Sequence, residues 1–376
     1  MTPPHAFARA LRRWLDRTGD PTVLAIVRIA IGIFLFKSAL DAGLQFKRVG
    51  FFGDHFHMPF DIGIAPEHFV LGRSQYLVLI VTRVLLAVLV TIGLFARPAL
   101  LVTSILGVYV LLCDRLQFHH NRYSLLCYAF LLSLTPCDKR WAIGGDRESG
   151  KPALLWAVPL VMAQVSLIYV ASGGSKLLDP DWRDGTVMGL RLFGAIPKLR
   201  DIGAPESVIR WVATPSAGSF AAKGAIITEL FLAVGLWVRP TRVVALWWGI
   251  LFHLWIELTA KVELFSWLTI AMYAVFATHD VHARKVMFDP TRASANVIAR
   301  LIALLDWFAR FEIKKWTPDP LKEGHAIVIV RRDGSFATGI YALLMATRCL
   351  PALFPLWAPM AIIVWFVGKE PLKINE

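Results

Sequence analysis

The chain has 376 residues, of which 56% are hydrophobic and 18% are charged, and its mean hydropathy is +0.57. This composition excludes an ordinary water-soluble protein, because the surplus apolar surface must face lipid. The net charge of +13 does not predict nucleic-acid binding, since the basic residues are scattered among apolar segments and form no continuous stripe. Anionic lipid headgroups are the simpler partner for these charges.

Apolar segments that reach or approach the length of a membrane-spanning helix recur up to residue 278. They predict an α-helical polytopic membrane bundle of about eight spans. In chain order the predicted spans are residues 22–46, 76–95, 99–113, 124–136, 153–171, 221–238, 243–258 and 264–278. The fourth is the shortest of them.

Basic residues gather at one side of these spans, before the first, after the fourth, and between the sixth and the seventh. They are Arg9, Arg12, Arg13 and Arg17, then Lys139, Arg140, Arg147 and Lys151, then Arg239 and Arg242. The positive-inside rule therefore predicts that both termini are cytoplasmic. The basic connection 176–223 opposes this orientation, although long loops follow the rule poorly. We expect a multi-pass protein of a bacterial inner membrane.

Three regions are predicted: residues 1–21, a transmembrane domain at 22–282, and a C-terminal domain at 283–376. Residues 4–17 form either a basic amphipathic helix on the inner membrane surface or a solvated terminus. The four cysteines form no CxxC pair and have no zinc-type spacing. We therefore expect neither a disulfide framework nor a structural metal.

The residue pattern of the C-terminal region differs from that of the apolar spans. Residues 286–289 resemble a strand, residues 296–313 are amphipathic at helical spacing, and 326–336 read as a hairpin closed by Asp333-Gly334. Two apolar helical stretches follow, at 340–349 and 356–367. This order predicts a small α/β cytoplasmic domain. The alternative is that residues 350–367 form a ninth span, against which Pro351 and Pro355 argue.

The most informative segment is YVASGGSKLLDPDWRDG at residues 169–185. Its small residues, 171–175, allow another backbone to approach closely. Lys176 then follows near the membrane boundary, with Asp181 and Trp182 close behind it. A partly desolvated lysine in this place could act as a base. The alternative is a lysine whose stem lies in the membrane while its ammonium reaches the headgroups.

Three further ionisable residues lie within apolar spans: Glu229, His253 and Glu257. His253 and Glu257 are four residues apart and so share one helix face. Intramembrane charges usually face a bundle interior, a cavity or a partner. They could relay a proton or line a polar cavity, or they could form a structural cluster that fixes helix packing. We predict no metal site, because a metal needs more ligands than these.

The loop before the fourth predicted span contains His120, Asn121 and Arg122. Adjacent histidines in this loop point to different sides of any regular element and do not predict a shared ion. Asn121 and Arg122 are suited to an anionic or polar headgroup. Arg28 in the first span is predicted to pair with one of the intramembrane acids.

These residues, in this order, resemble the HTTM family, the horizontally transferred transmembrane domain related to vitamin K-dependent γ-glutamyl carboxylase. The resemblance covers residues 22–280 and is most specific at SGGSKLLDPDWRDG, with support from Arg28, Asn121, Tyr123, Glu229, His253 and Phe265-Ser266. It implies that Lys176 is a base that deprotonates a quinol, and hence that a quinone or hydroquinone is bound. The chain departs from the carboxylase in two ways. Asn121, with His120 beside it, stands where the carboxylase has a functional histidine, and the large lumenal region that follows the membrane bundle of the carboxylase is missing. We therefore expect no glutamate carboxylation.

Residues 286–368 resemble the DCC family of thioredoxin-like thiol-disulfide oxidoreductases, through VMFDPTRASANVIARLIALLDWFARFEI and the RRDGSFATGIYALL block. In that family Asp-Gly-x-Cys-x-x-Cys follows the first strand. Here Arg292 and Ala295 occupy the two cysteine positions. Since thiol-disulfide exchange requires a thiolate, the resemblance implies a redox-inactive thioredoxin-like domain.

Two functions remain open. The first is a membrane enzyme, or a remnant of one, that binds a quinone or other lipid, with Lys176 as the catalytic base. Its ligand-binding residues would be Trp182, Asp181, Asn121, His120, Glu229, His253 and Glu257. The second is a non-catalytic membrane protein whose residues 283–376 bind a cytoplasmic protein partner. A transporter is a weaker candidate, because no inverted repeat is evident.

Overall fold

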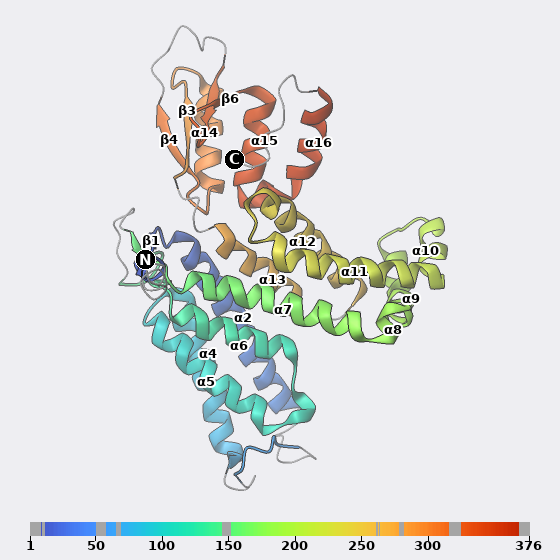
Figure 1. The fold of residues 1–376 in the computed structure, drawn as a ribbon. Coiled ribbons are helices and arrows are strands. Elements are labelled where there is room, and N and C mark those ends of the chain that lie inside the picture. Colours follow the sequence, from blue (N-terminus) through green and yellow to red (C-terminus); the bar gives the residue numbers. More distant parts are fainter. Residues whose placement is uncertain are drawn as a thin grey trace. The chain divides into compact units, whose positions relative to one another are not determined.

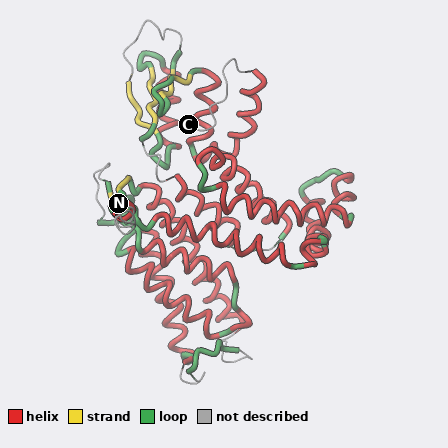
Figure 2. Tube along the Cα trace, in the orientation of Figure 1, coloured by secondary structure: helices red, strands yellow, loops and turns green. Residues whose placement is uncertain are grey.

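The computed structural model of the protein describes residues 9, 12–49, 58–64, 69–144, 152–260, 262, 264–277, 282–315 and 325–367. Helices dominate, and strands form two small sheets (Figures 1 and 2). The chain divides into two compact units. The first comprises Met1–Val165 and Val262–Val275, and the second comprises Ser166–Lys261 and Phe276–Glu376.

The first unit is a helical bundle. Its elements are β1 (Thr18–Gly19), α2 (Thr22–Val49), α4 (Arg73–Ile92), α5 (Ala96–Cys113), η2 (Arg115–Gln117), α6 (His120–Ser133), β2 (Ala153–Leu154) and α13 (Phe265–Met272). Helix α2 packs against α4, α6 and α13, while α5 lies between α4 and α6. Gly32 of α2 lies against the backbone of Thr91, where any side chain would collide, so the glycine permits the close α2–α4 contact. Strands β1 and β2 pair antiparallel.

Arg28 is fully buried in the second turn of α2. Its guanidinium donates hydrogen bonds to the backbone carbonyls of Cys137, Arg140 and Trp141, at 3.2, 3.3 and 2.6 Å. The predicted pairing of Arg28 with an intramembrane acid is therefore wrong. The reason is that Arg28 lies close to the start of α2, level with a loop whose carbonyls have no helical partners.

The second unit contains the remaining elements of the chain. They are α7 (Val158–Leu178, which begins in the first unit), α8 (Pro180–Arg183), α9 (Thr186–Asp201), α10 (Glu206–Val212), α11 (Pro215–Gly235), α12 (Arg239–Thr259), η3 (Tyr273–Ala277, which also begins in the first unit), β3 (Arg284–Phe288), α14 (Ala293–Leu305), β4 (Phe311–Lys315), β5 (Ile327–Val330), β6 (Phe336–Ala337), α15 (Gly339–Cys349), η5 (Pro351–Leu356) and α16 (Trp357–Val367). Helix α11 packs against α8, α9 and α12 (Figure 1).

In the part of the chain that the structure describes, six helices are long and apolar enough to cross a membrane: α2, α4, α5, α7, α11 and α12. The protein is therefore a multi-pass integral membrane protein. The predicted number of eight spans is not confirmed. The fourth predicted span corresponds to α6, whose 14 residues rise only about 21 Å against the roughly 30 Å of a bilayer core. The eighth corresponds to the short helix α13 with η3.

The number of candidate spans among the described residues rises to seven if residues 339–367 are counted as one span. Helix α15 and the segment Pro351–Val367 pass the same test of length and composition together, but they are bent by 118° at their junction. Pro351 and Pro355 account for the bend, since neither has an N–H to continue a helix. Such a pair is either one broken span or a re-entrant loop.

Between residues 284 and 337 the chain forms a four-stranded sheet in the order β4-β3-β5-β6. Strand β3 is parallel to β4 and antiparallel to β5, and β5 pairs antiparallel with β6. The predicted strand near residue 286 and the predicted hairpin are thus confirmed. The predicted helical stretch 296–313 is wrong at its end, because α14 stops at Leu305 and residues 311–315 form β4.

The turn between α14 and β4 is built around Asp306. Its carboxylate accepts hydrogen bonds from the backbone N–H groups of Arg310 and Phe311, both at 2.8 Å, and Ala309 adopts a φ of 50°. Burial raises the pKa of Asp306 above its usual value despite these bonds. Phe311 then enters the core with Val286, Ile302 and Ile329. Half of the predicted amphipathic segment 4–17 lies outside the described residues, and within the described half residues 12–15 are helical.

Candidate intramembrane site around Lys176

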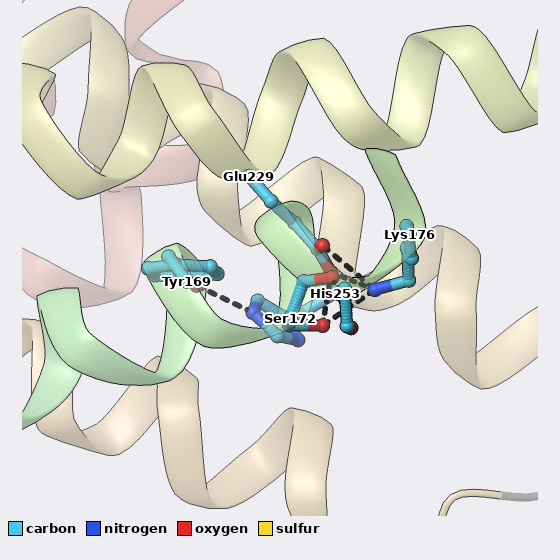
Figure 3. Close-up of polar contacts among 6 residues, drawn as sticks. Tyr169, Ser172, Lys176, Glu229 and His253 are labelled. Carbon is cyan, nitrogen blue, oxygen red and sulfur yellow. Dashed lines mark hydrogen bonds and ion pairs between the residues drawn. The ribbon is translucent and has the colours of Figure 1, made fainter. Parts of the chain in front are cut away.

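The C-terminal half of α7 presents a polar face inside the second unit. Tyr169, Ser172 and Lys176 follow one another at intervals of three and four residues, so they lie along one side of the helix. Two turns of α7 therefore align a phenol, a hydroxyl and an ammonium. Figure 3 shows these three side chains directed toward α11 and α12.

Lys176 forms an ion pair with Glu229 of α11 (Figure 3). Its Nζ lies 2.6 and 2.7 Å from the two carboxylate oxygens. Ser172 joins the pair, since its Oγ accepts a hydrogen bond from Lys176 and donates one of 3.1 Å to Glu229. The Lys176 side chain is 14% exposed and the Glu229 side chain 6%, so both charges are largely withdrawn from solvent while the ammonium keeps some access.

Glycines bring α7 and α11 close enough for this pair to form. A Cβ on Gly173 would lie 3.2 Å from the side chain of Leu230 and 3.3 Å from Cβ of Glu229. At the other end of the segment, Gly185 adopts a φ of 96° and lies directly against the backbone of Ser219 in α11. Gly185 therefore cannot be replaced by a residue with a side chain without moving the backbone, whereas at Gly173 a side chain would be tight and Leu230 would have to shift slightly.

Two cations lie near the ring of Trp182. The Nζ of Lys176 is 5.0 Å from the Trp182 ring centroid, and the Cζ of Arg191 is 5.1 Å from it. Helix α8 carries Trp182 back toward Lys176, because Asp179 ends α7 and caps α8 by accepting the N–H of Asp181 at 2.9 Å. Asp181 itself is exposed, and only its backbone takes part in this arrangement.

His253 of α12 is fully buried, and its Nε2 lies 2.7 Å from the hydroxyl of Tyr169. Which of the two atoms donates depends on the histidine tautomer. Because Tyr169 is one turn before Ser172, the face of α7 links this contact to the Lys176–Glu229 pair (Figure 3). Among the described residues, no group of three histidines, cysteines or acids is placed to hold a metal ion.

A family model described as the HTTM domain matches residues 16–280. The chain belongs to the HTTM domain family. Tyr169, Ser172, Lys176, Glu229 and His253 all lie within the matched HTTM segment. No solved structure matches the chain.

Other residues predicted for the site lie elsewhere in the HTTM domain. The backbone carbonyl of Glu257 accepts a 2.7 Å hydrogen bond from Lys198, but its carboxylate does not join the cluster, although it is one turn after His253. Asn121 belongs to the first unit, where its amide donates to the carbonyl of Val262 at 2.7 Å. His120, also in the first unit, is exposed and contacts Phe118 edge-on.

Three members of the cluster escaped the sequence prediction: Tyr169, Ser172 and Arg191. A usable signal existed for the first two, because they precede Lys176 by seven and four residues on the same helix and therefore share its face. Arg191 offered no comparable signal, since its position over Trp182 depends on the turn from α8 into α9.

Proposed function

We propose that this HTTM-domain protein binds a quinone or a related lipid within the membrane and that Lys176 serves there as a base. The observation that carries the proposal is the Lys176–Glu229 ion pair, two charges held between apolar helices. Buried intramembrane charges are costly and mark functional sites by default. The resemblance of the segment around Lys176 to vitamin K-dependent carboxylase supports the choice of a quinol.

The residues around Lys176 provide a route for its proton. Before the lysine can act as a base it must lose a proton, and the carboxylate of Glu229, at 2.6 Å, is the group positioned to take it. The neutral amine can then accept a proton from a ligand hydroxyl. Ser172 contacts both members of the pair and holds the amine in place during the exchange. A bound hydroquinone supplies an acidic phenolic hydroxyl and two reducing electrons.

The surroundings of the pair suit a ligand with a flat ring and an apolar tail. Trp182 offers a ring beside the ammonium, and aromatic rings stack on such surfaces. Apolar side chains on the same helices are exposed, including Leu177 and Leu178 of α7 and Ile227 of α11. These exposed residues support access from the lipid phase.

Lipid extraction followed by mass spectrometry of the purified protein tests this proposal. We expect a quinone to accompany the wild type and to be depleted about tenfold or more in Lys176→Ala, in line with the loss of one hydrogen bond to a charged group. Lys223→Ala, which removes an exposed lysine of α11, is the matched control and should keep the quinone. If Lys176→Ala does not fold, Lys176→Met/Glu229→Gln removes both charges together. Equal quinone content in all variants would contradict the proposal, as would its absence from the wild type.

We propose, in addition, that residues 283–376 are a degenerate DCC-type domain with a thioredoxin-like fold. The sheet order β4-β3-β5-β6 supports this, since a parallel βαβ unit is followed by an antiparallel hairpin and a helix. Arg292 caps α14 and Ala295 lies in its first turn, where the two cysteines of the DCC motif would stand. In the variant Arg292→Cys/Ala295→Cys we expect a disulfide between the new cysteines. Thiols that stay free under mild oxidation would argue against the assignment.

The orientation belongs to the same proposal. Both termini would lie in the cytoplasm, across a bacterial inner membrane, as the basic residues flanking the spans indicate.

A further inference from the structure

Helix α4 of the first unit carries an arginine in the middle of a membrane span. Arg83 follows the first residue of α4 by ten positions and precedes the last by nine. At 1.5 Å per residue, this places it about 15 Å along a helix that crosses roughly 30 Å of hydrocarbon. Its side chain is 5% exposed. An arginine at this depth is expected to face a partner or a cavity within the bundle.

The guanidinium of Arg83 lacks a counterion among the described residues. Its one hydrogen bond there joins Nη2 to the Oγ of Ser38 at 3.5 Å, the limit for such a bond, and its Nε has no partner in this part of the chain. Neutral hydroxyls compensate a buried cation poorly, because a charged group withdrawn from water needs an opposite charge or several good hydrogen bonds.

Arg83 lines a pocket enclosed by α2, α4, α5 and α6. The polar side chains of this pocket are Ser38, Gln45, Tyr76, Arg83, Asp114 and Arg122. Two cations therefore face one carboxylate, which leaves one positive charge in excess. Oxygen Oδ1 of Asp114 already accepts the backbone N–H groups of Met58 and Leu116, at 3.2 and 3.0 Å. Apolar side chains, among them Leu125 and Leu126 of α6, complete the wall.

We propose that this pocket binds the anionic group of an amphiphile, a carboxylate or a phosphate, with Arg83 as its main contact and Arg122 as a second. Planar guanidinium groups bind both anions through paired hydrogen bonds. The apolar wall would contact the hydrocarbon part of the ligand. This site is separate from the one proposed around Lys176, since all its residues belong to the first unit. A membrane lipid and a water-soluble anion share the recognised group, and the test separates these two sources.

Binding to the full-length protein in micelles of a neutral detergent tests the inference. The probes are oleate, dioleoyl phosphatidate, inorganic phosphate, and dioleoyl phosphatidylcholine as a ligand without net charge. We expect saturable binding of oleate or phosphatidate, and a loss of about tenfold or more in affinity for Arg83→Gln and for Arg122→Gln. Arg73→Gln removes an exposed arginine at the start of the same helix and should bind within about twofold of the wild type.

The temperature of thermal unfolding provides a second measurement, which can be made on Arg83→Gln even if this variant binds no anion. Without anion, Arg83→Gln should unfold at the same temperature as the wild type or above it, because it removes a buried charge that lacks a counterion. Oleate or phosphatidate should raise the unfolding temperature of the wild type and leave that of Arg83→Gln unchanged. If inorganic phosphate is the only probe that binds saturably, the site binds a water-soluble anion, and the proposal of an amphiphilic ligand is refuted. If wild type and Arg83→Gln bind the probes with equal affinity, or if none of the probes binds saturably, the proposal of an anion site at Arg83 is refuted.

Discussion

The ammonium of Lys176 contacts both carboxylate oxygens of Glu229, at 2.6 and 2.7 Å, although the two residues are 53 positions apart in the sequence. Each side chain lies in a mostly apolar helix, and each is the counterion of the other. Breaking such a buried pair by removing one partner leaves a charge without compensation, whereas removing both can be close to neutral.

Substituting either partner alone should destabilise the protein strongly. We expect Lys176→Met and Glu229→Gln each to lower the free energy of unfolding by about 3–5 kcal/mol, and the double variant to recover most of that loss. Denaturant titration in mixed micelles measures the free energy of unfolding of the wild type, the two single variants and the double variant, which together form a double-mutant cycle. Lys223→Met serves as the control with little effect. Additive losses in the double variant would mean that the two side chains do not interact.

The contact between Tyr169 and His253 should behave as a buried hydrogen bond. Tyr169→Phe leaves His253 Nε2 without the hydroxyl that lies 2.7 Å away, which we expect to cost about 1–3 kcal/mol of unfolding free energy. Tyr169→Phe/His253→Phe replaces both partners by apolar rings and should cost less than the sum of the single variants. Denaturant titration in mixed micelles measures the free energy of unfolding of these variants. An unchanged stability in Tyr169→Phe would contradict the contact.

Two glycines, one before the start of α9 and one in its interior, distinguish the effect of backbone strain from that of helix propensity. Gly185 has a φ of 96° and lies on the backbone of Ser219, so Gly185→Ala should lower the melting temperature. Gly194 lies inside α9, and a Cβ added there would meet open space. Gly194→Ala should therefore be neutral or stabilising by up to about 1 kcal/mol. Equal effects at both positions would argue against the close packing of Gly185.

Asp20 should make the protein sensitive to acid. Burial alone would raise its pKa, but hydrogen bonds from Thr22 and the ion pair with Arg140 hold that pKa below the usual 3.8. Because the folded-state pKa is the lower one, the stabilisation is present above about pH 4 and is lost as the pH falls through the lowered pKa. Asp20→Asn should be about 1–2 kcal/mol less stable than the wild type at neutral pH and should approach it below pH 3. Unfolding curves measured from pH 7 down to pH 2.5 check this; a constant difference between the two proteins would contradict it.

The membrane class and the three ionisable members of the candidate cluster could be predicted from the sequence, because both follow from where charges interrupt apolar runs. Lys176, Glu229 and His253 stand out for that reason alone. Their pairing could not be predicted, since it depends on how α7, α11 and α12 are rotated against one another. Glu257 illustrates this limit, because it shares a helix face with His253 and yet makes a different contact.

Each of the remaining differences between prediction and structure has an identifiable structural cause. Arg28 was expected to find an acid, but backbone carbonyls of a loop more than 100 residues away bind it instead. The segment 296–313 keeps a helical spacing of apolar residues past Leu305, so its pattern did not reveal the turn at Asp306 or strand β4. Tertiary hydrogen bonds decided the first case, and local hydrogen bonds of the Asp306 carboxylate to the backbone contributed to the second.

Photolabelling with a quinone that carries a diazirine on its ring tests the central claim most directly. If the ring binds beside Lys176, peptide mapping should place the label within residues 169–191, and excess unlabelled quinone should compete for it. Lys176→Met/Glu229→Gln should lose this label, while Lys223→Met should retain it. Labelling that resists competition, or that is equally strong in the double variant, would contradict a quinone site at Lys176.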